Sequence, residues 1–279
     1  MTDSYVTLYS NLAFSQNDPT AFFVLLFLFM GRMLPIIVLA PFFGGKVMPN
    51  PVKIVFSFCL FAVFLPQLAS ITNATLAFNI ASVLLFLKEA LVGLIIGFFI
   101  GVPFIVVQNT GSLIDFQRGA SSLMVSDPST QTQTSPMGTL YNLLLIYLFY
   151  LIEGPFTVLE IISTSYDLLP PDQFLSSRFF LNSGHFMKEL QSLVGQIMIL
   201  STQLAAPALI MILMTDFFLG IANRLAPQVQ ITFLGMPLKS LLALVIVFFG
   251  WQLFIKQIVL ESREWTNYLS RLITMFIPA

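Results

Sequence analysis

The hydrophobic positions of this chain fall into long continuous runs that short polar segments separate. The runs cover residues 20–43, 52–70, 76–107, 139–163, 193–222 and 231–256. Their lengths approach or exceed the roughly 20 residues that a membrane-spanning helix needs. Residues 257–277 instead alternate apolar and charged positions at helical spacing, which predicts an amphipathic helix on a surface or a partner. The pattern predicts an all-α membrane protein of kinked helical hairpins, folded as a single domain over residues 1–279.

Glycine and proline interrupt these runs in an ordered way. Gly93, Gly97 and Gly101 recur every four residues, which places them on one helix face where a neighbouring backbone can approach closely. Pro103 follows and is expected to bend the chain, and Gly154-Pro155 breaks the fourth run. Irregular backbone at membrane depth is tolerated only where protein covers it or where it lines a cavity. The helices are therefore expected to pack on protein.

A polar segment, residues 108–138, separates the third and fourth runs and is rich in Gly, Ser, Thr and Gln. We predict a loop over these residues. Long loops without periodicity of their own are usually functional or disordered, and the plain alternative is an ordinary exposed loop. Asp115 and Arg118 are three residues apart and are expected to pair on one helix face.

Isolated charges lie inside the apolar runs, where they are costly in lipid and by default face protein or water. Arg32 lies in the first run, and the neighbours Lys88 and Glu89 lie in the third. Adjacent helical residues point to different faces, so Lys88 and Glu89 are not expected to pair with each other. All three are predicted to be packing charges between subunits.

Three further charges belong to the last two runs. Asp216 lies inside the run over residues 193–222, Arg224 follows that run, and Lys239 lies inside the run over residues 231–256. Either they form buried pairs that set the register of the helices, or they contact neighbouring subunits. Glu153 precedes the Gly154-Pro155 break, where a proton-responsive role in a pore is a further hypothesis.

Composition narrows the class of protein. Charged residues make up 9% of the chain, far below the approximately 25% of soluble domains, so a water-soluble globular protein is excluded. A net charge of −1 offers no field that would attract nucleic acid. The single Cys59 and the single His185 give no metal-ligand spacing, and no catalytic motif is present. We therefore expect no enzyme activity, no cofactor and no metal.

Three segments in this order resemble the FliR-like subunit of the type III secretion export gate, in its injectisome form. They cover residues 32–54, 111–136 and 208–244, and the spacing between them and the total length also fit. The most specific part is NRLAPQ followed by LGMPLKS, which contains Pro227, Gln228, Pro237 and Lys239. Flagellar members tend to carry a Gly-Gly-His cluster where this chain reads EGPFTVLE, which favours the injectisome form.

The resemblance implies a structural subunit of an inner-membrane entry portal for unfolded secreted proteins. One copy would join several copies of two smaller helical subunits in a helical assembly that projects toward the periplasm, with a further gate subunit wrapped around its entrance. A loop of this subunit would plug the closed pore. The matching residues are Asp115, Phe116, Gln117, Arg118, Gly119, Leu123, Met124 and Val125.

Two other functions compete with this reading. A secondary transporter or channel for a small solute would also use broken helices and midplane charges. Such transporters often have related halves, and no internal symmetry is visible here. A membrane enzyme would need Glu153, Glu160 and Asp216 to act together, but they lie on separate turns and runs without a convincing set of partners.

Overall fold

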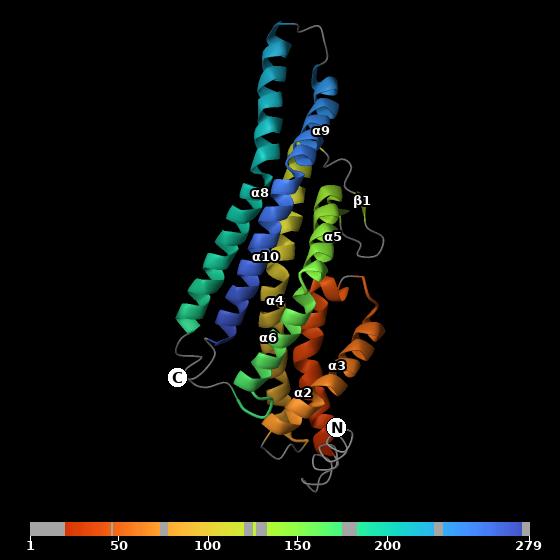
Figure 1. The fold of residues 1–279 in the computed structure, drawn as a ribbon, viewed down its shortest axis with the longest axis vertical. Coiled ribbons are helices and arrows are strands. Elements are labelled where there is room, and N and C mark those ends of the chain that lie inside the picture. The colour runs from red at the N-terminus through yellow and green to blue at the C-terminus, as the bar shows by residue number, and fades with distance from the viewer. Residues whose placement is uncertain are drawn as a thin grey trace. The chain divides into compact units, whose positions relative to one another are not determined.

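The computed structural model describes residues 20–45, 47–72, 78–119, 125–126, 133–174, 183–225 and 231–274. Within these residues the chain is almost entirely helical, which confirms the all-α prediction (Figure 1). A short antiparallel hairpin pairs Val125 with Thr134 and Ser126 with Gln133. The elements are α2 (Thr20–Leu39), η1 (Pro41–Phe43), α3 (Asn50–Ile71), α4 (Ile80–Gln117), β1 (Val125–Ser126), β2 (Gln133–Thr134), α5 (Pro136–Leu151), α6 (Gly154–Leu168), α8 (Ser183–Leu225), α9 (Ile231–Phe249) and α10 (Trp251–Thr274).

The predicted loop over residues 108–138 is wrong at its start, because α4 continues to Gln117. Its polar residues do not end the helix because they find partners on other elements. The Thr110 hydroxyl donates to the carbonyl oxygens of Val106 (2.9 Å) and Ser201 (3.2 Å), the second of which belongs to α8. A buried polar group with a partner costs little, so polarity alone does not predict a loop here.

The predicted boundaries of the last helices also change. The apolar helix expected over residues 193–222 extends over Ser183–Leu225. The helix expected over residues 231–256 instead ends at Phe249, and α10 begins at Trp251 after a bend of 65°. Gly250 lies at this bend, where a residue without a side chain lets the backbone turn. The amphipathic segment predicted from residue 257 is thus the later part of α10.

Four of the described helices are long and apolar enough to cross a membrane: α2, α3, α4 and residues 191–225 of α8. The number rises to six if each of two broken pairs, α5 with α6 and α9 with α10, counts as one span. This protein is therefore a multi-pass helical membrane protein of broken helices.

The chain divides into two compact units. The first contains residues 1–101, 153–186 and 265–279, and the second contains residues 102–152 and 187–264. Helix α4 contributes its earlier part to the first unit and its later part to the second. A single domain over residues 1–279 stays a prediction.

In the first unit, α2 lies in the core. Its Phe29 ring stacks on Tyr166 of α6 and contacts Phe61 of α3. Helix α4 crosses α2 closely: a Cβ atom at Gly93 would lie 2.2 Å from the Arg32 carbonyl oxygen. A Cβ at Gly97 would lie 3.0 Å from the Ile36 Cα, so the predicted close approach at the glycine face is found between these two helices.

In the second unit, the later part of α4 contacts α5 and α8. Phe104 packs edge-on against Phe149 of α5. The Ser201 hydroxyl of α8 donates to the Ile197 carbonyl oxygen of its own helix at 2.6 Å and lies 3.2 Å from the Val106 carbonyl oxygen of α4. The Thr110 hydroxyl lies 3.2 Å from the Ser201 carbonyl oxygen, so polar groups of α4 and α8 meet inside the protein.

Candidate functional site

The predicted plug residues fall on the end of α4 and just beyond it. Asp115, Phe116 and Gln117 form the last residues of the helix, and Arg118 and Gly119 make the turn that follows. Gly119 has a φ of 81°, a left-handed conformation that glycine adopts without strain. The turn therefore directs the chain out of the helix at a defined residue.

The remaining plug residues are only partly within the described structure. Leu123 and Met124 lie outside the described residues. Val125 is the first residue of β1, and its backbone pairs with that of Thr134 in β2. The segment thus leaves α4 at Gly119 and returns through β2 to Ser135.

Asp115 joins the two ends of this segment. Its Oδ1 pairs with the Arg118 guanidinium, with the Nη2 atom at 2.5 Å and the Nε atom at 2.8 Å. Its Oδ2 accepts hydrogen bonds from the Ser135 hydroxyl (2.6 Å) and from the Met137 backbone N–H (2.9 Å). The predicted pairing of Asp115 with Arg118 is confirmed, and the same carboxylate also holds the chain where it returns.

The returning end is the start of α5, and Asp115 completes its cap. Ser135 is the N-cap residue, and its hydroxyl oxygen accepts from the Gly138 N–H at 2.8 Å. Met137 is a first-turn residue whose N–H has no acceptor within its own helix, so the carboxylate of Asp115 satisfies it. A negative charge at a helix N-terminus is also favoured by the helix dipole.

Two glycines let this contact form. A Cβ atom at Gly111 would lie 2.4 Å from the Gly138 backbone nitrogen, and a Cβ at Gly138 would lie 2.8 Å from the Gln108 carbonyl oxygen. We define the loop base as Asp115, Arg118 and Ser135 with this crossing of Gly111 and Gly138. Sequence analysis missed Ser135, Gly111 and Gly138, although Ser135-Pro136 is a recognisable helix start.

Within the loop base, Asp115 is 1% exposed and Arg118 is 11% exposed in their side chains, whereas the Phe116 ring is 67% exposed. Asp115 is therefore a structural anchor, and Phe116 is the most exposed of the predicted plug residues on α4.

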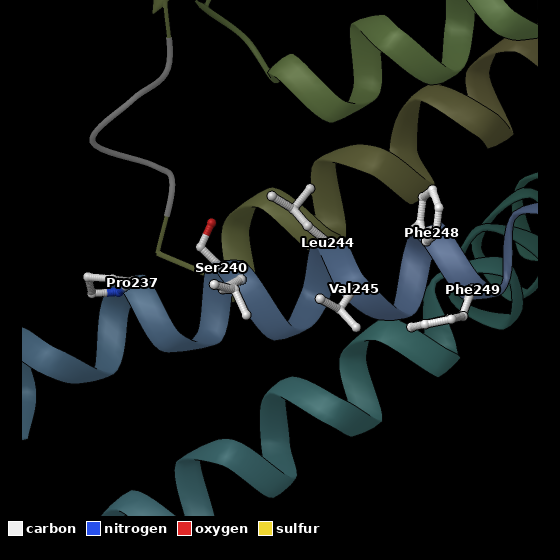
Figure 2. Close-up of a pocket in the computed structure, with 7 residues that line it drawn as sticks. Pro237, Ser240, Leu244, Val245, Phe248 and Phe249 are labelled. Atoms are coloured by element: carbon white, nitrogen blue, oxygen red, sulfur yellow. The ribbon is translucent and has the colours of Figure 1, made fainter.

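Arg118 also reaches α9. Its Nη1 donates to the Ser240 hydroxyl at 3.2 Å. Ser240 lines a shallow groove of about 660 Å³ along α9 (Figure 2), whose other lining residues are apolar: Pro237, Leu241, Leu244, Val245, Phe248 and Phe249. The predicted residue Pro237 lies at one end of this groove.

The other predicted charges of the last helices are placed as follows. Asp216 of α8 and Lys239 of α9 form an ion pair, so they link two helices of the second unit. Arg224 is exposed near the end of α8. Pro227 and Gln228 lie outside the described residues.

Arg32 and Glu89 form a fully buried pair in the first unit, each with a side chain that is 0% exposed. The guanidinium binds both carboxylate oxygens, with Nε to Oε2 at 2.5 Å and Nη2 to Oε1 at 2.9 Å. The prediction that these residues pack between subunits is wrong, because both are satisfied within this chain. Lys88 also pairs with Glu89 at 2.5 Å, so the prediction that these neighbours do not pair is wrong as well. The long side chains of adjacent residues can bend toward each other when a third group nearby binds one or both of them.

That third group is the end of α6. Arg32 donates to the backbone oxygens of Ser165 (2.9 Å) and Leu169 (2.7 Å), which lie at the helix C-terminus where carbonyls lack intrahelical donors. Its guanidinium also lies 4.0 Å from the centre of the Tyr166 ring. Lys88 donates to the carbonyl oxygens of residues 170 and 173 at 2.9 Å and 3.0 Å. The cluster therefore fastens α2, α4 and the end of α6 together.

Glu153 lies at the break between α5 and α6, where it is exposed and adopts a φ of 57°. It is the N-cap of α6, and its side chain makes no capping bond. No group of three or more potential metal ligands among His, Cys, Asp and Glu occurs in the described part of the chain.

The chain matches the family model described as bacterial export proteins, family 1, over residues 23–264. It is 32% identical over 181 residues to the secretion system apparatus protein SsaT of Salmonella typhimurium, which covers 65% of this chain and 68% of that protein. It is 30% identical over 217 residues to the surface presentation of antigens protein SpaR of Shigella flexneri, which covers 78% and 81%. A flagellar biosynthetic protein FliR from Pectobacterium carotovorum is 28% identical over 207 residues, which covers 74% and 76%.

Proposed function

The chain belongs to family 1 of the bacterial export proteins, and we propose that it is a structural component of the inner-membrane export apparatus of a type III secretion system. The secretion system apparatus protein SsaT is 32% identical to this chain, whereas the flagellar biosynthetic protein FliR is 28% identical. The injectisome form of the apparatus therefore fits this chain better than the flagellar one.

Within that apparatus, we propose that the segment between Arg118 and Ser135 closes the passage for secreted proteins. The observation that supports this role is the loop base. Asp115 contacts both Arg118 and Ser135, so the two ends of the segment are held to the helices that carry it. A plug needs fixed ends, because it must leave the passage and return to the same place without unfolding those helices.

The remaining partners follow from the same resemblance. One copy of this chain joins several copies of two smaller helical subunits, and a larger gate subunit surrounds the entrance. The assembly projects toward the periplasm, and unfolded secreted proteins pass through it. The exposed apolar face of α3, with Val55 and Val63 at 63% and 72% exposure, is consistent with burial against membrane lipid or other subunits.

The test replaces residues 120–132 with a short Gly-Ser linker and keeps Asp115, Arg118 and Ser135. The chain is produced with the other export subunits of its organism, in cells whose native copy has been removed. Assembly should be intact, measured as co-purification in mild detergent, while the membrane becomes permeable to ions and small dyes. The matched control is Glu264→Gln, an exposed change on α10 that should leave permeability at the wild-type level.

An assembled apparatus that carries the linker and shows no added leak would remove the plug assignment. A wild-type chain that retains none of the export subunits would remove the proposed function itself. The solute-transporter alternative predicts a lone chain that binds a small solute.

A further inference from the structure

Lys53, near the start of α3, is a buried cation whose ammonium group has no partner among the described residues. The residue is only 8% exposed. The other two buried cations of the described residues, Arg32 and Lys88, both form ion pairs with Glu89. The Lys53 ammonium makes neither an ion pair nor a hydrogen bond with any described group. Because a buried charge without a partner is costly, Lys53 favours an anion that comes from outside this part of the chain.

The surface against which Lys53 packs does not supply that anion. Lys53 lies on the buried face of α3 together with Ser57 and Phe61, and the Phe61 ring contacts Phe29 of α2. The Ser57 hydroxyl, one turn beyond Lys53, is enclosed and has no hydrogen-bond partner among the described residues. Long side chains of a helix lean toward its N-terminus, so the apolar stem of Lys53 packs here while its ammonium lies toward the start of α3.

The start of α3 adds a second positive feature. The first turn contains no acidic residue, and the N-cap residue Pro49 makes no side-chain capping bond. The N-terminus of a helix carries about half a positive charge, which favours an anion and disfavours a lysine. The start of α5 shows the contrast, because there Ser135 and the carboxylate of Asp115 bind the free N–H groups. At the start of α3, the helix dipole and an unpaired lysine meet with no negative group of the described residues to balance them.

The position of Lys53 along α3 indicates the kind of anion. Helix α3 is one of the candidate membrane spans, and its 22 residues extend over about 33 Å, close to the roughly 30 Å of a hydrocarbon core. The ends of such a helix lie at the depth of the lipid headgroups. Next to Lys53, the apolar side chains of Ile54, Val55 and Phe58 are exposed, as expected for contact with acyl chains. The anion that a membrane offers at this depth is a phospholipid phosphate.

We propose that the start of α3 binds the headgroup phosphate of an anionic phospholipid, with Lys53 as the charged ligand and the exposed apolar side chains beside it against an acyl chain. A headgroup without a cation of its own, as in phosphatidylglycerol, fits better than a zwitterionic one, whose phosphate is already balanced. The bound lipid neutralises Lys53 and holds the start of α3 at headgroup level. This inference concerns the chain itself and depends neither on the plug nor on the export partners.

The first test measures lipid binding by the full chain. The chain is purified in mild detergent, depleted of lipid and titrated with phosphatidylglycerol, and the lipids bound per chain are counted by native mass spectrometry. Lys53→Met keeps an apolar stem and removes the charge, so the affinity should fall about tenfold or more with the loss of a charge-assisted hydrogen bond. Lys53→Arg should retain binding, because a guanidinium also binds phosphate. Lys256→Met, the matched control at an exposed lysine of α10, should leave the affinity unchanged.

The choice of ligand separates this site from weaker alternatives. Phosphatidylethanolamine should bind less tightly than phosphatidylglycerol. Inorganic phosphate in large excess should not displace the lipid, because it makes no apolar contact, and displacement would show a site for free phosphate instead. Equal losses in Lys53→Met and Lys256→Met would show only a general attraction between cations and an anionic surface, and would overturn the proposal.

A second measurement uses the wild-type chain, so it does not depend on the folding of any variant. Phosphatidylglycerol with a photoreactive group in its headgroup should label residues 49–53, and labelling only elsewhere would contradict the site. The same labelling is repeated on the chain purified together with its export partners. If the label disappeared there, a group of a neighbouring subunit would occupy the place of the phosphate and the lipid assignment would be wrong.

Discussion

Replacing Asp115 by alanine should destabilise the fold more than any exposed change near it. The substitution removes the acceptor of the Ser135 hydroxyl and of the Met137 N–H and leaves the Arg118 guanidinium without its partner. The Asp115 side chain is almost fully buried, so no water replaces these bonds without first opening the contact between α4 and α5.

The magnitude follows from the kind of bonds that are lost. Removing one partner of a buried ion pair costs about 3–5 kcal/mol, and the lower half of that range applies because Arg118 retains some exposure. For a chain of this size, each kcal/mol lowers the midpoint of thermal unfolding by about 2–4 °C. Asp115→Ala should therefore lower the midpoint by roughly 10 °C. Ser135→Ala removes one helix cap and should cost about 1 kcal/mol.

The assay is thermal unfolding of the purified chain in mild detergent, followed by helical circular dichroism. Phe116→Ala is the matched control, since its neighbouring ring is largely exposed and its removal should shift the midpoint by less than about 2 °C. If Asp115→Ala unfolded within about 2 °C of the wild type, the carboxylate would not anchor the loop base. The proposed plug would then need another fixed attachment to the helices.

Two further predictions concern Arg32 and Trp265, which both belong to the first unit. Arg32→Lys should lower the free energy of unfolding by about 3 kcal/mol in the same assay. A lysine cannot bind both Glu89 oxygens and the Ser165 and Leu169 carbonyls at once. An unchanged midpoint of unfolding would contradict the role of the cluster. Trp265→Phe should cost about 1–2 kcal/mol, because the indole N–H donates at 2.7 Å to the Phe99 carbonyl, which Pro103 leaves without its usual helical donor. In a chain that carries Pro103→Ala, the loss of stability caused by Trp265→Phe should be smaller by about 1 kcal/mol, since the alanine supplies the missing N–H to the Phe99 carbonyl. An equal loss with and without Pro103→Ala would refute this link between Pro103 and Trp265.

The spacing of residues along the sequence predicted correctly the contacts that depend only on which residues share a helix face. The four-residue spacing of Gly93 and Gly97 predicted a close helix crossing, and the structure places the α2 backbone against both. The three-residue spacing of Asp115 and Arg118 predicted their pair. Such features need only the geometry of one helix, so a single sequence reveals them.

The errors arose where the partner of a polar group is distant in sequence. Residues 108–117 read as a loop because of their polarity, but Thr110 and Asp115 are satisfied by Ser201 and Ser135 on other elements. Arg32 and Glu89 read as contacts between subunits, but they meet each other from 57 residues apart. Periodicity shows that a polar residue in an apolar helix needs a partner, and only the tertiary structure shows which chain supplies it.

This distinction separates two kinds of charge in the protein. The Arg32–Glu89 pair and the Asp115–Arg118 pair are buried and bonded within the chain, so they contribute to folding and hold the helices in place. Glu153 and Glu160 are exposed, and no described lysine or arginine pairs with them. The first kind stays satisfied whatever surrounds the chain, because its partners belong to the same chain. The second kind is exposed, so its environment depends on what lies next to the chain.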